Sequence, residues 1–262
     1  MSKKSENQED TSALSTKKSR YEVEEYKSFD DMNLKEDLLR GIYAHGFESP
    51  SPIQQKGIVP VIKGYDSVVQ AQSGTGKTAT FCIAILQNVD ASQKTNQALV
   101  LAPTREISKQ IFGVMKALAS HMDISIEKSI GGMRVKRSEE KKYYDSLLQS
   151  QVICGTPGRV YDNLNNKRIL SNNLKMFVLD EADNLLDHGF KEQIIEIFKY
   201  IERNCQVAIY SATMPENVLE LTNKFMENPV KILLKTEALT LEGIKQYYIA
   251  LQNEEQKFDV II

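Results

Sequence analysis

Residues 71–78, AQSGTGKT, have the composition and spacing of a loop that binds phosphate. The apolar run SVVQ (67–70) precedes the loop and the helix-like ATFCIAIL (79–86) follows it, which is the context such a loop requires. Gly74 and Gly76 let successive backbone N–H groups approach an anion at the helix N-terminus. Lys77 would reach the β- and γ-phosphates, and the Thr78 hydroxyl would ligate Mg²⁺. The alternative, a glycine-rich turn that only caps a core helix, is less consistent with the flanking strand and helix.

A second group with possible chemistry is acidic and lies in MFVLDEAD (176–183). Asp180 ends the apolar run, so its carboxylate is predicted at the sheet edge where ligands bind, holding Mg²⁺ through water. Glu181 follows and could orient or deprotonate an attacking water. An acid-rich stretch after a strand is by itself equally consistent with an N-capping turn. Paired with the phosphate loop, it predicts a nucleotide hydrolase.

The elements that must position these groups alternate along the chain. Helix-period segments such as 105–121 and 191–202 separate short continuous apolar runs, which favours a parallel sheet covered on both faces. We therefore predict a doubly wound α/β domain over residues 28–235, preceded by a disordered tail (1–27) and followed by a linker with the start of a truncated second domain (236–262). The predicted strands are SVVQ (67–70), QALVLA (97–102), QVICG (151–155), MFVLD (176–180), QVAIYS (206–211) and VKILL (230–234).

Composition limits the classes of function. The 33 basic and 35 acidic residues give a net charge of −2, which argues against a broad basic surface for nucleic acid. The three cysteines have no C-x-x-C spacing and the three histidines are scattered, so neither a disulfide framework nor a zinc site is expected. No apolar run approaches the ~18 residues that span a bilayer, and we expect a cytoplasmic protein, with the nucleus as the alternative.

Further motifs occur in a recognisable order: PTREI (103–107), GG (131–132), TPGR (156–159), DEAD (180–183) and SAT (211–213). Together they resemble the DEAD-box RNA helicases, whose form of the phosphate loop begins with alanine, as Ala71 does here. The resemblance implies a RecA-like first domain that binds ATP and Mg²⁺. It also implies a second RecA-like domain, of which 236–262 would be the beginning. The chain alone is then expected to be a nearly inactive ATP hydrolase and helicase.

The nucleotide contacts follow from this resemblance. GFESPSPIQ (46–54) is similar to the family's adenine-reading segment, which implies that Gln54 hydrogen-bonds the adenine edge while Phe47 packs on the ring. An amide offers both a donor and an acceptor, which suits adenine. Core packing is the alternative for Phe47. The phosphate loop would contribute Ala71, Gln72, Ser73, Gly74, Thr75, Gly76, Lys77 and Thr78.

The family grips RNA by its sugar–phosphate backbone, independently of sequence, which suits a chain without a basic surface. TPGR reads as a helix start with Thr156 at the cap and Pro157 at the first position, and a helix N-terminus binds phosphate without net positive charge. A surface salt bridge is the alternative for Arg159. The residues implied in RNA binding are Arg105, Gly132, Thr156, Gly158 and Arg159.

The SAT motif is implied to couple nucleotide state to RNA binding. Ser211 and Thr213 would contact Asp183 through their hydroxyl groups. The alternative is that these hydroxyls cap the helix formed by MPENVLE (214–220).

Within the family, stretches such as AQSGTGKTATF, MFVLDEAD and LTLEGIKQ resemble the initiation factor 4A subgroup. This implies a monomer that acts in translation initiation with a scaffold protein. Exon-junction and ribosome-biogenesis helicases of the subgroup remain alternatives, and Asn184 and DHGF (187–190) depart from its usual pattern. A nucleotide-switched interaction protein and a DNA helicase are rivals of other classes, although the chain lacks the guanine-reading N-K-x-D motif.

Overall fold

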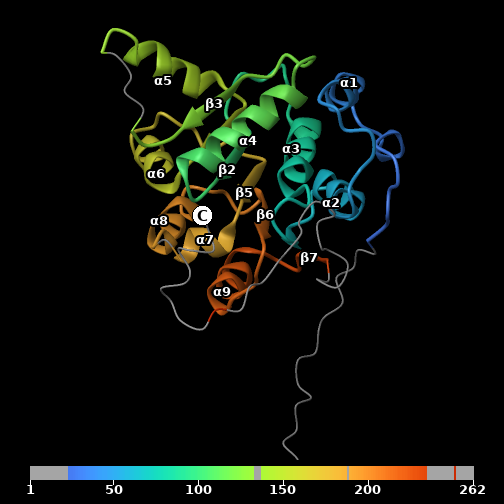
Figure 1. Cartoon of the computed structure of the whole chain (residues 1–262). Helices are drawn as coiled ribbons and strands as arrows, with labels where there is room; N and C mark the ends of the chain where they lie inside the picture. The colour runs from blue at the N-terminus through green and yellow to red at the C-terminus, as the bar shows by residue number, and fades with distance from the viewer. Residues whose placement is uncertain (1–22, 133–136, 188, 235–250, 252–262) are drawn as a thin grey trace, which may run out of the picture.

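The computed structural model describes residues 23–132, 137–187, 189–234 and 251. Within these residues the strands form one sheet of seven, all paired in parallel, with the order β3-β4-β2-β5-β6-β1-β7 (Figure 1). The predicted parallel α/β fold is therefore confirmed. The strands are β1 (Ser67–Gln70), β2 (Ala98–Leu101), β3 (Ile126–Ser129), β4 (Val152–Gly155), β5 (Met176–Leu179), β6 (Gln206–Ser211) and β7 (Val230–Leu233).

Helices cover both faces of the sheet, and alternate strand residues enter two separate cores. Val178 and Tyr210 face the first core, whereas Leu179 and Ile209 face the second. Burial on both faces explains the continuous apolar runs. Around the first core lie α1 (Glu36–Ala44), α2 (Pro52–Ile62), α3 (Lys77–Asn88) and α4 (Arg105–Leu118). The second core is covered by α5 (Glu140–Gln149), α6 (Pro157–Asn165), α7 (Ala182–Asp187), α8 (Lys191–Phe198) and α9 (Glu216–Phe225).

Strand β3 was not among the predicted strands. Its sequence, IEKS, places two polar residues in the middle, and only Ile126 and Ser129 are fully buried. The reason is its position, because β3 pairs with β4 on one side only and forms an edge of the sheet. A strand at an edge needs no apolar run, so a search for continuous apolar segments misses it.

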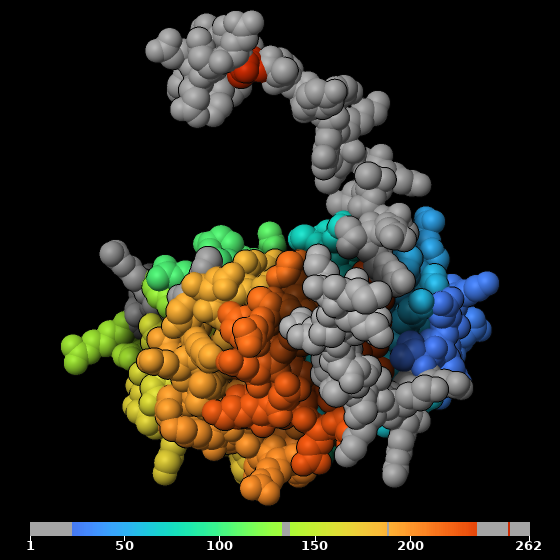
Figure 2. Space-filling model, turned by 90° about the horizontal axis from the view of Figure 1, so that it is seen from below, coloured from blue at the N-terminus to red at the C-terminus, as the bar shows by residue number. Residues whose placement is uncertain are grey.

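At the N-terminal side, contacts with the domain begin before the predicted boundary at residue 27. The Tyr26 backbone N–H donates a hydrogen bond to the Gln55 carbonyl at 3.1 Å, and Glu25 forms an ion pair with Lys56 at 3.0 Å. Seen from below, the blue surface of the N-terminal helices lies at the right of the molecule, and the orange surface of the later helices lies at its centre and left (Figure 2). Residues 236–262, predicted as a linker and the start of another domain, lie outside the described residues except Leu251.

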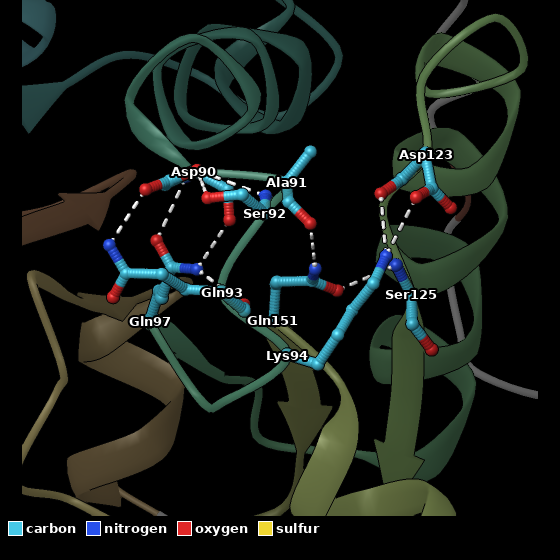
Figure 3. A network of polar contacts seen from close by, with 9 residues as sticks. All are labelled: Asp90, Ala91, Ser92, Gln93, Lys94, Gln97, Asp123, Ser125 and Gln151. Atoms are coloured by element: carbon cyan, nitrogen blue, oxygen red, sulfur yellow. Dashed lines mark hydrogen bonds and ion pairs between the residues drawn. The ribbon is translucent and has the colours of Figure 1, made fainter.

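Two buried amides hold the amino ends of the strands together (Figure 3). Gln97, just before β2, donates to the Asp90 carbonyl at 2.7 Å and accepts from the Asp90 N–H at 2.9 Å. Gln151, just before β4, accepts from the Ser125 N–H at 2.8 Å and donates to the Ala91 carbonyl at 3.2 Å. These side chains satisfy backbone N–H and C=O groups before the hydrogen bonds between the strands begin. They therefore hold the amino edge of the sheet in place.

Among the described helices, none has the length and apolar character needed to cross a bilayer.

Candidate active site at the carboxyl edge of the sheet

Every predicted motif except the adenine-reading segment (46–54) lies at the carboxyl end of a strand, so the parallel sheet brings these motifs to one edge. The strand order divides that edge into two halves. The phosphate loop, SAT and DEAD follow β1, β6 and β5, which are neighbours in the sheet. PTREI, TPGR and GG follow β2, β4 and β3, which are also neighbours. A candidate nucleotide site and a candidate RNA site therefore lie side by side.

The phosphate loop turns sharply between β1 and α3. Gly74 and Gly76 have φ angles of 81° and 100°, which only glycine adopts without strain, and Gly76 is the N-cap of α3. A side chain on Gly76 would also collide with Gln54, because a Cβ there would lie 2.6 Å from Gln54 Nε2. Glycine is therefore required at position 76 for two reasons: the backbone conformation and the lack of space for a side chain.

Lys77 lies across its own loop. It is 7% exposed, and its ammonium donates hydrogen bonds to the carbonyl oxygens of Ala71 and Gln72. Burial lowers the pKa of Lys77, an effect that the nearby carboxyl groups of the DEAD motif oppose. In this structure the Lys77 ammonium is hydrogen-bonded to two backbone carbonyl oxygens. Phosphate oxygens could take the place of these acceptors, which suits a lysine that binds phosphate.

The segment before α2 is joined directly to the phosphate loop. The Gln54 side chain accepts from the Ser51 N–H at 2.9 Å and its amide donates to the Gly76 carbonyl at 3.4 Å. The Ser51 hydroxyl donates to the Thr75 carbonyl at 2.8 Å. Gln54 thus contacts backbone at both ends of its amide in this structure, and these contacts to the loop were not predicted from the sequence.

Asp180 is the buried acid of the site, 3% exposed and directly after β5. Burial and the neighbouring Glu181 raise its pKa to about 7, while Lys77 acts in the opposite direction. A buried carboxyl group with one nearby lysine is costly unless a further cation approaches it. A hydrated divalent cation close to the Asp180 carboxylate would reduce this cost.

Glu181 has an unusual backbone, with a φ of 50°. Left-handed conformations of residues other than glycine cost of order 1–3 kcal/mol and cluster at functional sites. The Asn184 amide donates to the Glu181 carboxylate at 2.9 Å, so the side chain is held as well as the backbone. Asn184, noted from the sequence only as a departure from the subgroup, therefore has a structural role beside Glu181, the candidate catalytic base.

Asp183 joins the DEAD and SAT motifs. Its carboxylate accepts from the Thr213 N–H at 2.9 Å and from the Thr213 hydroxyl at 2.8 Å, and its backbone N–H donates to the Ser211 hydroxyl at 3.2 Å. Burial acts to raise the pKa of Asp183, but these hydrogen bonds outweigh it and hold the pKa below its usual value. Helix α9 has Pro215 at its N-cap without a side-chain bond, so these hydroxyls do not cap it.

A cavity of about 250 Å³ lies over these groups. Thr78 and Asp180 line the same cavity, as do Glu181 and Phe47. Phe47 also packs against the first core and contacts His45 edge-on, so the core-packing alternative describes part of its role. The described residues hold no cluster of three acidic, histidine or cysteine ligands. One hydroxyl and one carboxylate nevertheless fit Mg²⁺, which usually keeps several waters and takes its remaining ligands from phosphates.

A second cavity of about 810 Å³ lies on the other half of the edge, here called the groove. It brings together four of the predicted RNA residues, Arg105, Thr156, Gly158 and Arg159, and also Asp162 and Phe190, which were not predicted. Sequence spacing could have suggested Asp162, because it lies one turn after Arg159 in α6.

Gly132, the fifth predicted RNA residue, lies against Arg105. Its φ is 72°, and a Cβ there would lie 2.4 Å from Arg105 Nη1. The glycine therefore admits the arginine side chain, a contact that was not predicted from the sequence. Its effect on the groove is to set where the Arg105 guanidinium lies.

The TPGR motif forms the helix start that was predicted. Thr156 is the N-cap of α6, Pro157 is its first residue and Gly158 is exposed. Arg159 forms an ion pair with Asp162 at 3.5 Å. Arg159 is therefore both a lining residue of the groove and a salt-bridge partner, and its two interpretations are compatible.

Comparisons with known proteins agree with this geometry. A family model described as DEAD/DEAH box helicase matches residues 51–221. The chain is 53% identical over 241 residues to the ATP-dependent RNA helicase eIF4A of Saccharomyces cerevisiae, covering 92% of this chain and 60% of that protein. It is 52% identical over 240 residues to the ATP-dependent RNA helicase fal1 of Schizosaccharomyces pombe, with the same coverage. The chain thus spans about three-fifths of these relatives.

Solved structures show the same similarity in three dimensions. S. cerevisiae Dbp5 bound to RNA and ADP BeF3 superposes with a TM-score of 0.79 at 34% identity, covering 90% of this chain and 59% of that one. A DEAD box protein from Methanococcus jannaschii superposes with a TM-score of 0.77 at 32% identity, covering 90% and 62%. The family resemblance seen in the motifs is therefore confirmed: the chain belongs to the DEAD/DEAH box helicase family.

Proposed function

We propose that this chain is the nucleotide-binding part of an ATP-dependent RNA helicase. The observation that carries the proposal is the arrangement of the sheet edge. The nucleotide cavity and the groove occupy adjacent halves of it. On the nucleotide half, Asp183 is hydrogen-bonded to Thr213, which follows β6. A movement of the DEAD motif would therefore also move the carboxyl end of β6, which lies between β5 and β1 in the sheet.

The roles within the nucleotide cavity follow from the contacts. Lys77 exchanges the carbonyls of Ala71 and Gln72 for phosphate oxygens. Thr78 and Asp180 hold the hydrated Mg²⁺, which neutralises phosphate charge when bound. Glu181 orients the attacking water and Gln54 reads the adenine edge. The shared cavity supports the roles of Lys77, Thr78, Asp180 and Glu181. The role of Gln54, which does not line this cavity, is supported by the family resemblance and by its contact with the phosphate loop.

Nucleotide binding is tested by thermal unfolding of the chain with and without ATP or ADP and Mg²⁺. At about 100 times Kd the stabilisation is ~2.7 kcal/mol. A domain of this size should then melt about 5 °C higher. Lys77→Ala should abolish the shift, whereas Lys94→Ala, at the opposite edge of the sheet, should retain it. An undiminished shift in Lys77→Ala would show that the phosphate site is misassigned.

RNA is proposed as the nucleic acid because the groove offers a helix N-terminus and two arginines to a backbone rather than to bases. The Dbp5 relative solved with RNA supports this choice. Competition between RNA and DNA strands of the same sequence distinguishes the DNA-helicase rival. A nucleotide-switched interaction protein would bind neither strand and would bind a partner only with ATP.

Within the family we propose a role in translation initiation, as a cytoplasmic monomer that works with a scaffold protein. The support is the 53–55% identity to proteins named eIF4A. A ribosome-biogenesis or exon-junction role, which the sequence resemblance also allows, is the second candidate. Addition of the whole protein to a translation extract depleted of its own initiation factor 4A tests the choice. Failure to restore translation would favour the second candidate.

A further inference from the structure

An arginine and a tyrosine lie stacked beside the groove, outside the motifs described above. Arg168 follows helix α6, and Tyr144 lies on helix α5. The central carbon of the Arg168 guanidinium is 3.9 Å from the centre of the Tyr144 ring. Tyr143 lies next to Tyr144, with ring centres 5.3 Å apart. The groove together with this pair would make a longer surface than the motifs alone provide.

The pair is continuous with the groove through Asp162. One carboxylate oxygen, Oδ2, lies 3.5 Å from Arg159 Nη1 and 3.8 Å from Arg168 Nη1. Asp162 lines the groove and Arg168 does not, so Arg168 lies just beyond the end of the groove. The Arg159 and Arg168 side chains are 31% and 32% exposed, so each side chain is partly accessible to solvent.

Both members of the pair are held by rigid surroundings. The Tyr143 hydroxyl donates to the Lys128 carbonyl at 2.8 Å and the Ser146 hydroxyl donates to Glu127 at 2.7 Å, so α5 is fixed to β3 on either side of Tyr144. The Arg168 backbone N–H donates to the Asn163 carbonyl at 2.8 Å. A preorganised pair loses little conformational freedom on binding a ligand.

The chemistry of the pair suits an unpaired nucleotide. A guanidinium plane stacks on nucleobases as it does on tyrosine, and its charge attracts the adjoining phosphate. Stacking needs no particular base, which agrees with a groove that contacts only the sugar–phosphate backbone. Asp162 pairs with both guanidinium groups and offsets part of their positive charge.

We propose that Arg168 and Tyr144 form a stacking platform that binds one unpaired RNA nucleotide beyond the end of the groove. The proposal rests on the proposed function, because it extends the same RNA path. The platform adds affinity only when the RNA is long enough to leave the groove. It would act as a second point of attachment for single-stranded RNA.

The test is a length series of oligouridylates, from about 4 to about 12 nucleotides, titrated into the chain at low salt and followed by NMR. Binding to the unsubstituted chain should strengthen stepwise once the RNA reaches the platform. Tyr144→Ala and Arg168→Ala should each remove that step, weakening the long RNAs about fivefold or more and leaving the short ones unchanged. Tyr144→Phe should keep the step, and Arg168→Lys should lose it, because an ammonium does not stack.

Two controls separate this platform from the groove. Arg159→Ala should weaken RNAs of every length, and Lys94→Ala should weaken none. If Arg159→Ala weakens binding but Tyr144→Ala and Arg168→Ala do not at any length, the platform is wrong and the groove stands. If no RNA binds, or if Arg159→Ala has no effect, both the proposed RNA function and the platform fail.

Discussion

At the scale of single residues, the site is built from groups that are unfavourable in isolation. Asp180 is a buried carboxyl group with a pKa raised to about 7, and Glu181 has a left-handed backbone. Neither feature stabilises the domain, and each is placed where a phosphate–metal complex is expected. Positioning these groups before a ligand binds lowers the free energy of unfolding of the domain.

The raised pKa of Asp180 predicts a particular dependence of stability on pH. Its pKa in the folded state lies above the ordinary value of 3.8, so the folded state favours the protonated carboxyl. The stability from this group is complete below about pH 4 and decreases as the pH rises towards 7. Asp180→Asn should remove this decrease, raising the free energy of unfolding at pH 8 by up to about 4 kcal/mol.

Thermal unfolding in EDTA without nucleotide, at pH 5 and pH 8, measures this effect. The gain of Asp180→Asn should be larger at pH 8 than at pH 5. A variant that is less stable than the parent at pH 8 would show that the carboxylate is stabilised by contacts that outweigh its burial.

Gln54 is predicted to act on two parts of the nucleotide. Its side chain is bonded to Ser51 and to the Gly76 carbonyl, so Gln54→Ala should loosen the phosphate loop and weaken ATP and GTP by a common factor. Loss of the base contact should weaken ATP further, by about fivefold for one hydrogen bond. Calorimetric titration with both nucleotides gives the ratio, and Gln55→Ala is the matched control. Equal losses for ATP and GTP would remove the base-reading role.

At the scale of elements, the sequence predicts the strands that carry the chemistry but not the contacts between the segments that follow them. Six apolar runs become β1, β2, β4, β5, β6 and β7. Burial on both faces selects such runs in the inner strands, whereas β7 lies at an edge and is buried on one face only. The edge strand β3 has no such run and was missed. The bond from Ser51 to Thr75 and the contact of Arg168 with the Tyr144 ring each join residues that are 24 apart in the sequence. Such pairs depend on how the turns meet in space, which local patterns do not encode.

The packing of Gly132 on Arg105 yields a prediction for the groove. Gly132→Ala should displace the guanidinium and strain the backbone at a φ of 72°, and so should weaken RNA binding about tenfold while leaving the nucleotide-induced melting shift intact. Gly113→Ala is the matched control, because a Cβ there meets nothing within 4 Å on helix α4. That control should stabilise the chain by about 0.5–1 kcal/mol. Unchanged RNA binding in Gly132→Ala would exclude Arg105 from the groove's function.

At the scale of the whole molecule, the nucleotide cavity holds only some of the charged groups that ATP hydrolysis is expected to require. Among the described residues that line the nucleotide cavity, Lys77 is the only cation. Stabilising the transferring phosphate usually takes an arginine as well, worth ~10³–10⁵ in rate. The relatives are longer, since the chain spans about three-fifths of them, and the family resemblance implies a second RecA-like domain there. That domain would also continue the RNA path and add the affinity of a linked second site.

These 262 residues should therefore bind nucleotide but show negligible RNA-stimulated ATP hydrolysis and no unwinding. Joining them to the remaining part of an eIF4A relative should restore both activities, because the joined part supplies the missing charge and RNA contacts. In the joined protein, Glu181→Gln should block hydrolysis while ATP still binds, since the amide cannot accept a proton from water. A steady-state ATPase assay with and without RNA measures each case. Strong RNA-stimulated turnover by the 262 residues alone would contradict the need for a second domain, because Lys77 is the only cationic side chain among the described residues that line the nucleotide cavity.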